Sequence, residues 1–169
     1  LAAAPGASST CTFDVTVNVP AGAPEGAYPN TTSEITATVD GATRTGLPAS
    51  DDLIIVAAPS ISKEFLNDPV QAGDMVDLQF TIEHSMLAAG DATSIMFTDD
   101  LAALSPMLPG LTATGLPIAA CGGTLSGSAG DTFLTFSGGT LSPGSSCTIT
   151  VTLQVPGSAS IDSYTNTTS

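Results

Sequence analysis

The chain has 169 residues and a formal net charge of −14, from 2 basic and 16 acidic residues. Nucleic-acid binding requires a basic surface, so this composition argues against a nucleic-acid partner. The same charge disfavours adhesion to anionic lipid. A hydrophobic fraction of 42% is enough for a packed core. No apolar run approaches the roughly 20 residues of a membrane span, and we expect no membrane insertion in this segment.

Three β-strands are expected in the first third of the chain. Over 13–19, apolar residues alternate with polar ones, and this period of two is typical of a half-buried strand. Shorter candidates lie at 35–39 and 53–56, and Asp40-Gly41 forms a turn signal between them.

A boundary between two structural units is expected near Ala57-Ala-Pro59, where one strand ends and another begins after a proline. Residues 1–58 are predicted to be the C-terminal strands of a preceding repeat module. Residues 59–169 are predicted to be most of the following β-sandwich module, without its last strands. So short a connection would couple the two units stiffly.

The second unit contains further short strand signals and one candidate for a single helical turn at Asp99–Leu104. Many short strands joined by Gly and Pro turns favour an antiparallel β-sandwich, and the missing crossover helices exclude a parallel α/β fold. The strands are expected at 61–65, 76–82, 95–98, 133–136 and 149–155. Two of them supply the expected core: Val76, Leu78, Phe80, Ile82, Ile149, Val151 and Leu153.

The two ends of the chain carry the same passage. Residues 11–33 align without a gap to residues 147–169, and 12 of the 23 positions are identical. Such a repeat indicates modules copied in tandem. The second copy stops where the first continues into Glu34–Val39, so we expect the chain to be a window from a longer array.

The three cysteines fit the same arrangement. Cys121 and Cys147 fall in one module and are expected to form a disulfide, which would stabilise it by about 3 kcal/mol. Cys11 is the repeat counterpart of Cys147, and its own partner would precede residue 1, so it should be unpaired here. The alternative is three buried, reduced thiols.

Several passages together form a recognisable pattern: Ser60–Phe65, Val70–Glu83, Ile95–Leu101, Cys121–Leu125, Gly138–Cys147 and Tyr164–Ser169. With them the chain resembles the conserved repeat domain of the DUF11 type, a family of bacterial surface repeats. Asp40–Thr43 and Ala49–Leu53 resemble the end of the same repeat. The resemblance implies immunoglobulin-like β-sandwiches in tandem on large exported proteins, an extracellular location and no catalytic residues. Where such repeats commonly carry Asn after the strand, this chain has Glu83-His84.

The sequence contains no clear pattern of metal-binding or catalytic residues. The carboxylate pairs Asp51-Asp52 and Asp99-Asp100 stand near strand ends, but Ca²⁺ takes about six to eight oxygens, usually from several loops. Solvated turn aspartates are the ordinary interpretation, and the alternative is loop-bound Ca²⁺ where the acidic loops of two modules meet. No other cofactor is expected. His84, the only histidine, is expected to be a solvated loop residue rather than a catalytic base.

Two asparagines and one lysine leave alternatives open. Asn30 and Asn166 occupy the same place in both copies and fit the glycosylation pattern N-x-[ST], or serve as hydrogen-bonding strand residues. Lys63 is the only lysine. It is either an exposed lysine at a strand edge or part of an amide crosslink to Asn or Asp, for which the sequence identifies no partner.

These patterns predict a structural repeat module of a large extracellular surface protein or filament, with no catalysis. Its partners would be neighbouring copies of the module, in the same chain or in adjacent subunits. One alternative is an adhesin that binds glycan or protein through its loops. Another is a filament of separate subunits assembled by β-strand donation.

Overall fold

The computed structural model describes residues 10–128 and 130–168, and their regular secondary structure is almost entirely β-strand, with antiparallel pairing throughout. The predicted all-β sandwich is confirmed. Residues 1–9 of the expected first unit, and Ser169 of the expected second unit, lie outside the described residues. The part of the chain that the structure describes contains no helix with the length and hydropathy that a membrane span requires.

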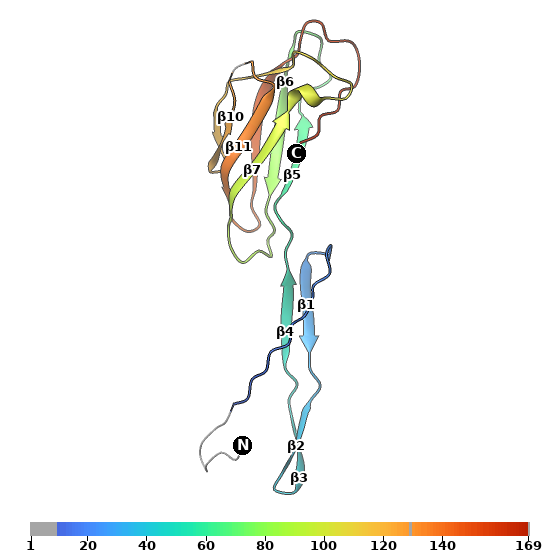
Figure 1. Cartoon of the computed structure of the whole chain (residues 1–169), viewed down its shortest axis with the longest axis vertical. Coiled ribbons are helices and arrows are strands. Elements are labelled where there is room, and N and C mark those ends of the chain that lie inside the picture. The colour runs from blue at the N-terminus through green and yellow to red at the C-terminus, as the bar shows by residue number, and fades with distance from the viewer. Residues whose placement is uncertain (1–9, 129, 169) are drawn as a thin grey trace.

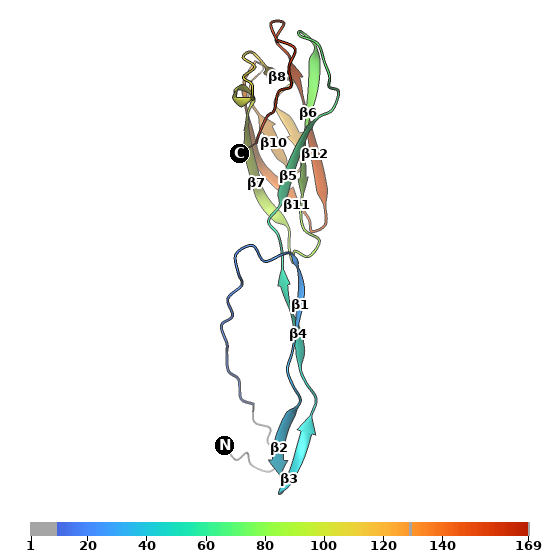
Figure 2. The same ribbon diagram turned by 90° about the vertical axis from the view of Figure 1, so that its right-hand side faces the viewer.

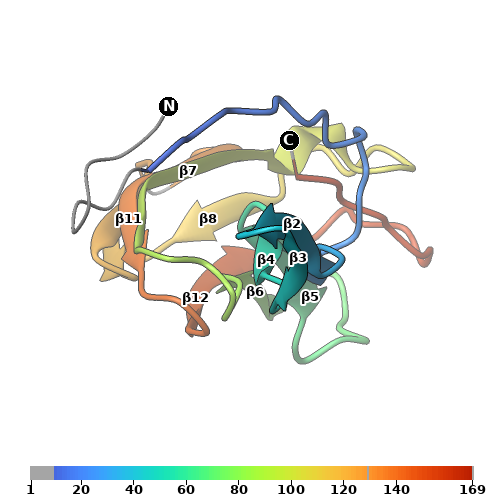
Figure 3. The same ribbon diagram turned by 90° about the horizontal axis from the view of Figure 1, so that it is seen from below.

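The sandwich consists of two four-stranded sheets, with the strand orders β7-β11-β10-β9 and β5-β6-β12-β8. Figure 3 looks along the long axis and places β7 on one side and β12, β6 and β5 on the other. The first sheet contains β7 (Ala92–Asp100), β11 (Phe133–Leu141), β10 (Gly123–Ser126) and β9 (Ile118–Ala120). The second contains β5 (Ser60–Phe65), β6 (Met75–Glu83), β12 (Ser146–Gln154) and β8 (Thr112–Thr114).

The core lies between the two sheets and follows the alternation of the sequence. All seven expected core residues on β6 and β12 are buried, because every second side chain of a strand points to the same face. Three aromatic rings connect the sheets: the Phe97 centroid lies 4.9 Å from that of Phe80 and 5.3 Å from that of Phe136. Such ring pairs add to the burial of apolar area.

Residues 24–58 form strands without a core. β1 (Gly26–Thr31) pairs with β4 (Ser50–Ile55), and β2 (Ile35–Val39) pairs with β3 (Ala42–Gly46). Asp40 and Gly41 both have positive φ, which suits the tight turn of the β2–β3 hairpin. Figures 1 and 2 show these strands beyond one end of the sandwich along the long axis. No described residue before position 59 is buried.

The strand expected at 13–19 is absent, and this prediction was wrong. Residues 10–20 are extended but join no sheet, and Figure 2 shows them running separately beside the hairpin strands. The repeat counterpart of this segment, β12, lies between β6 and β8. A strand needs a neighbour to accept its backbone hydrogen bonds, and the 13–19 segment has none within the described chain.

The remaining expected strands all form, most of them longer than the sequence indicated. The helical turn expected at Asp99–Leu104 is a short 3₁₀ turn, η1 (Leu101–Ala103). Five strands were missed because they are short or do not alternate: β1, β3, β8, β9 and β10.

Candidate functional site

A charged cluster lies where the edges of the two sheets approach each other. Lys63 is on β5, the edge strand of one sheet, and Asp99 is on β7, the edge strand of the other. The segment that follows Tyr164 brings Asn166 and Thr168 to the same place. In Figures 1 and 2 the C-terminal end of the chain lies beside β5 and β7.

The carboxylate of Asp99 is the centre of this cluster. Lys63 Nζ donates to Asp99 Oδ2, and Thr168 Oγ1 donates to the same oxygen at 2.8 Å. Asn166 Nδ2 donates to the other oxygen, Oδ1, at 2.7 Å. The side chain of Asp99 is 0% exposed and that of Lys63 is 13% exposed. A buried charge is tolerated only when it is paired and hydrogen-bonded, and both oxygens of Asp99 meet this condition.

Asn166 is held in place by its own segment. Thr165 exchanges two backbone hydrogen bonds of 2.9 Å with Ser105, and the Tyr164 hydroxyl donates to the Ser160 carbonyl at 3.0 Å. The carbonyl oxygen of Asn166, Oδ1, is buried and has no hydrogen-bond partner among the described residues. A small hollow of about 210 Å³ adjoins the cluster and is lined by Lys63, Tyr164 and Asn166 among others.

The cluster changes the interpretation of three residues. Lys63 is not the exposed edge lysine that the sequence favoured, because its amine points inward to Asp99. Asn166 cannot carry a glycan in this conformation, because its Nδ2 atom donates to a buried carboxylate. Asn30, its repeat counterpart, is exposed on β1. No local signal connects positions 63, 99 and 166, and only the sheet edges bring them together.

The four weak metal candidates do not share a site. Asp51 and Asp52 are on β4 in the hairpin region, whereas the oxygens of Asp99 are occupied by Lys63, Asn166 and Thr168. Asp100 caps the 3₁₀ turn, its Oδ1 accepting from the Ala102 amide at 2.9 Å. Within the described ranges, no group of three or more His, Cys, Asp or Glu residues could hold a metal ion.

His84 follows β6 in a loop, as expected, but it is half-buried rather than solvated, and its ring Nδ1 is buried without a hydrogen-bond partner among the described residues. Its ring Nε2 lies 3.1 Å from the Gly90 carbonyl oxygen, and its backbone amide donates to Ser145. Glu25 lies near this loop at the junction of the two regions. The Ala57 amide, then the Ser85 side chain and His84, hold the pKa of Glu25 below its usual range.

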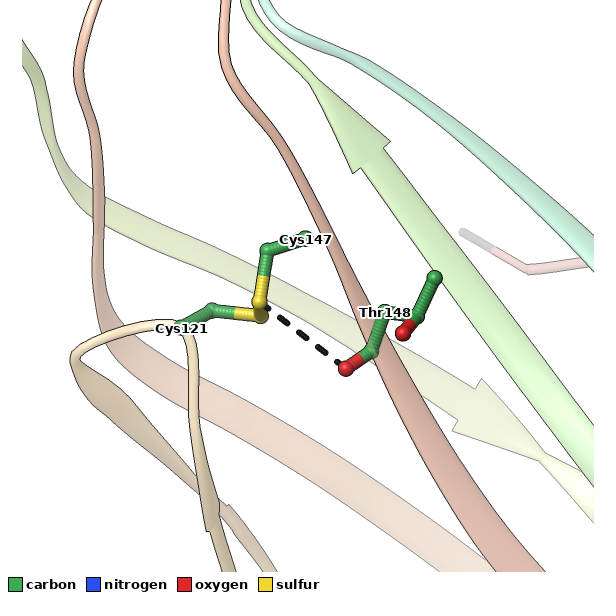
Figure 4. The surroundings of a disulfide bond; sticks show 3 residues. All are labelled: Cys121, Cys147 and Thr148. Carbon is green, nitrogen blue, oxygen red and sulfur yellow. Dashed lines mark hydrogen bonds between the residues drawn. A yellow bond between two sulfur atoms is a disulfide. The ribbon is translucent and has the colours of Figure 1, made fainter.

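The disulfide expected between Cys121 and Cys147 is present, and their Cα atoms lie 5.7 Å apart. Cys121 stands with Gly122 in the tight turn between β9 and β10, where both residues have positive φ. Cys147 is on β12, so the bond joins the two sheets (Figure 4). Cys11 is free and exposed, as its place in the repeat predicted.

A larger hollow of about 600 Å³ opens on the surface of the sandwich and is formed mainly by connecting segments. Its walls are largely apolar. Tyr164 lines both this hollow and the small hollow beside Lys63 and Asn166. Apolar lining residues include Val70, Leu104, Leu108 and Ile161. Such a hollow has the size of a small-ligand pocket.

One family of domains matches most of the chain. The model of one family, described as a domain of unknown function (DUF7933), matches residues 59–169. No curated protein and no solved structure matches the chain.

Proposed function

The chain belongs to the DUF7933 family of domains of unknown function, and from this starting point we propose that it is a structural repeat module. The module would form part of a large extracellular surface protein or filament, such as a stalk, fibre or matrix, without catalysis. The resemblance to DUF11-type repeats supports this proposal.

The observation that carries it is a repeat whose two copies differ in burial. Val151 on β12 is 0% exposed, whereas its counterpart Val15 is 73% exposed. One local contact of the repeat is retained: the Tyr28 hydroxyl donates to the Pro24 carbonyl as the Tyr164 hydroxyl donates to the Ser160 carbonyl. An apolar stripe of this kind marks an interaction surface. Residues 10–58 would therefore pack on the strands of another copy.

Charge and crosslinking agree with an extracellular polymer. A net charge of −14 keeps neighbouring molecules apart in solution. The disulfide between the sheets suits an oxidising compartment. The partners would be neighbouring modules, either along one chain or in adjacent subunits that donate strands to one another.

The proposal is tested on native material with an antibody raised against residues 59–169. We expect labelling of filaments or of the cell surface, and a denaturing gel band far larger than this chain. Labelled filaments that dissociate to short chains on the gel would favour strand donation between subunits. Labelling confined to the cell interior would contradict the proposal.

A second experiment tests the repeat itself. Because 147–169 corresponds to 11–33, a chain of residues 59–169 followed by residues 34–58 should be one complete module. We expect its added strands to be protected from hydrogen exchange, whereas the same tail with its sequence scrambled should not be. Equal exchange in the two chains would show that residues 34–58 do not complete the sandwich.

The hollow of about 600 Å³ favours one second candidate, an adhesin module that binds through its loops. Sugar sites usually use an exposed aromatic platform, and the chain has no Trp and only two Tyr. We expect no binding on a glycan array. Saturable binding that is lost on changing the exposed lining residue Ile161→Asp, with the fold retained, would favour the adhesin instead.

A further inference from the structure

We propose that Lys63 and Asn166 become joined by an intramolecular isopeptide bond, with Asp99 as the catalytic residue. The bond would run from Lys63 Nζ to the side-chain carbonyl carbon of Asn166. It would form within one module, without any other protein, and it stands independently of the function proposed above.

The geometry of a single carboxylate points to this reaction. One oxygen of Asp99 contacts the amine that would attack, Lys63 Nζ. The other oxygen contacts the amide nitrogen that would leave, Asn166 Nδ2, at 2.7 Å. An acid that touches both the nucleophile and the leaving group can carry a proton from one to the other.

The surroundings favour the reaction over a simple ion pair. Phe65 and Leu78 line the hollow beside Lys63, and an apolar surrounding makes a lysine amine a better nucleophile. Thr168 fixes the orientation of the carboxylate from a third side. The buried Asn166 Oδ1 has no partner among the described residues, and a buried polar atom without a partner requires an explanation. Because the reacting side chains are held next to each other, the reaction does not require them to meet by diffusion in solution.

Atoms and charges balance in three steps. Lys63 Nζ first gives a proton to Asp99, and the neutral amine adds to the Asn166 carbonyl carbon to form the new C–N bond. Asp99 then protonates Asn166 Nδ2, and the bond between Nδ2 and the carbonyl carbon breaks. The new amide nitrogen gives its surplus proton to the departing ammonia. The ammonium side chain and the carboxamide thereby give a secondary amide and one ammonium ion, and no oxidant or reductant is needed. The hollow beside the cluster gives ammonia a route to solvent.

The bond would connect the beginning and the end of the sandwich. Lys63 is on β5, the strand by which the chain enters the sandwich, and Asn166 is on the segment beyond the last strand, β12. A pulling force transmitted between Lys63 and Asn166 would act on a covalent bond rather than on β-strand hydrogen bonds. In a stalk or fibre, such a module would resist extension.

The test uses the small number of trypsin cleavage sites in this chain. Trypsin has only two sites, Arg44 and Lys63, and an amide on Lys63 Nζ blocks the second one. The mass is measured after the folded protein has been reduced and denatured. We expect it to be lower than the mass calculated from the sequence by one ammonia. Complete digestion should release residues 1–44 and one crosslinked fragment, without a separate 45–63 peptide. Fragmentation of that second piece should locate the link at Lys63 and Asn166.

Matched variants distinguish formation of this bond from other reactions that release ammonia. Asn30→Ala removes the exposed counterpart asparagine and should leave both the mass loss and the trypsin resistance unchanged. Asn166→Ala should keep the full sequence mass and be cut at Lys63. Asp99→Asn retains both reacting side chains and should also be cut at Lys63.

Two results would overturn the proposal. One is a folded, disulfide-bonded wild-type chain that keeps its full mass and is cleaved at Lys63, which would identify the cluster as an ion pair only. The other is a loss of ammonia that persists in Asn166→Ala, which would place the chemistry at another residue. The wild-type measurement decides the question even where the Asp99 variant does not fold.

Discussion

Residues 11–33 and residues 147–169 are copies of one sequence in two environments. In the second copy, β12 lies between β6 and β8, and its apolar residues are buried. In the first copy, the same alternation faces solvent, and no strand forms over 13–19. The tyrosine hydrogen bond, which spans only four residues, is present in both copies. Local sequence therefore fixes the corner around the tyrosine, whereas strand formation depends on partners far away in the chain.

The largest expected difference between the copies comes from placing a charge at one equivalent position. Val151→Asp puts an unpaired carboxylate in the core and should cost about 4 kcal/mol or more of unfolding free energy. Val15→Asp should change it by less than about 0.5 kcal/mol, because that side chain is in water. Urea unfolding followed by circular dichroism of each variant measures both values. Equal destabilisation would mean that 13–19 is buried in solution.

The cysteines give the next comparison. Replacing Cys121 and Cys147 together by serine removes a crosslink that spans 26 residues and should lower the unfolding free energy by about 3 to 4 kcal/mol. Cys11→Ser should leave it unchanged, because that thiol is free and exposed. Thermal unfolding with and without a reducing agent measures the effect. If the double variant is as stable as the wild type, the disulfide contributes nothing to folding.

The hydrogen bonds of Tyr28 and Tyr164 should differ less in their contribution to stability. Tyr164→Phe removes a hydrogen bond that holds the segment beside the Lys63–Asp99 pair and should cost about 1 kcal/mol. Tyr28→Phe removes the same bond in a region without a core and should leave the unfolding of the sandwich unchanged. Chemical unfolding of the two variants compares them directly. A larger effect for Tyr28→Phe would show that the first copy is packed against the sandwich.

The smallest expected effect is a pH dependence at the junction of the two regions. Glu25, whose counterpart in the second copy is Ile161, accepts a hydrogen bond from the Ala57 amide at 3.0 Å. That bond lowers the pKa of Glu25 from its ordinary value of 4.5, with smaller contributions from Ser85 and His84. A lowered pKa means that the contact is complete above the ordinary value and is lost as the pH falls through the lowered one.

We therefore expect the protection of the Ala57 amide, taken relative to its intrinsic exchange rate at each pH, to fall in acid on a curve that NMR can follow. Glu25→Gln should remove that acid dependence. An Ala57 amide whose exchange shows no titration beyond the intrinsic pH dependence would contradict this assignment.

Much of the sandwich could be predicted from the sequence because side chains alternate between the two faces of a strand with a period of two residues. Alternation over 76–82 and 149–155 identified the buried face of β6 and β12 without any knowledge of their neighbours. Short strands such as β8 and β9, of three residues each, were missed because they are too brief to show a period. The disulfide could be predicted because only two cysteines fall in the same unit.

The charged cluster could not be predicted in this way. The local sequence presents Lys63 as a lysine without a partner, Asp99 as a metal candidate and Asn166 as a glycosylation site, and no signal connects the three. Their contact depends on β5 and β7 being the edges of opposite sheets and on the final segment passing between them. A sequence pattern of period two carries no information about which strands become edges.

The sequence by itself determined the all-β class, the repeat, the buried faces of the central strands and the pairing of Cys121 with Cys147. Only the tertiary structure decided that 13–19 remains unpaired and that Lys63, Asp99 and Asn166 meet. The physical reason is that side-chain alternation and turn residues act over a few positions. Strand neighbours and side-chain clusters require loops of many residues to close, and only the packing of the complete sandwich selects which ones do.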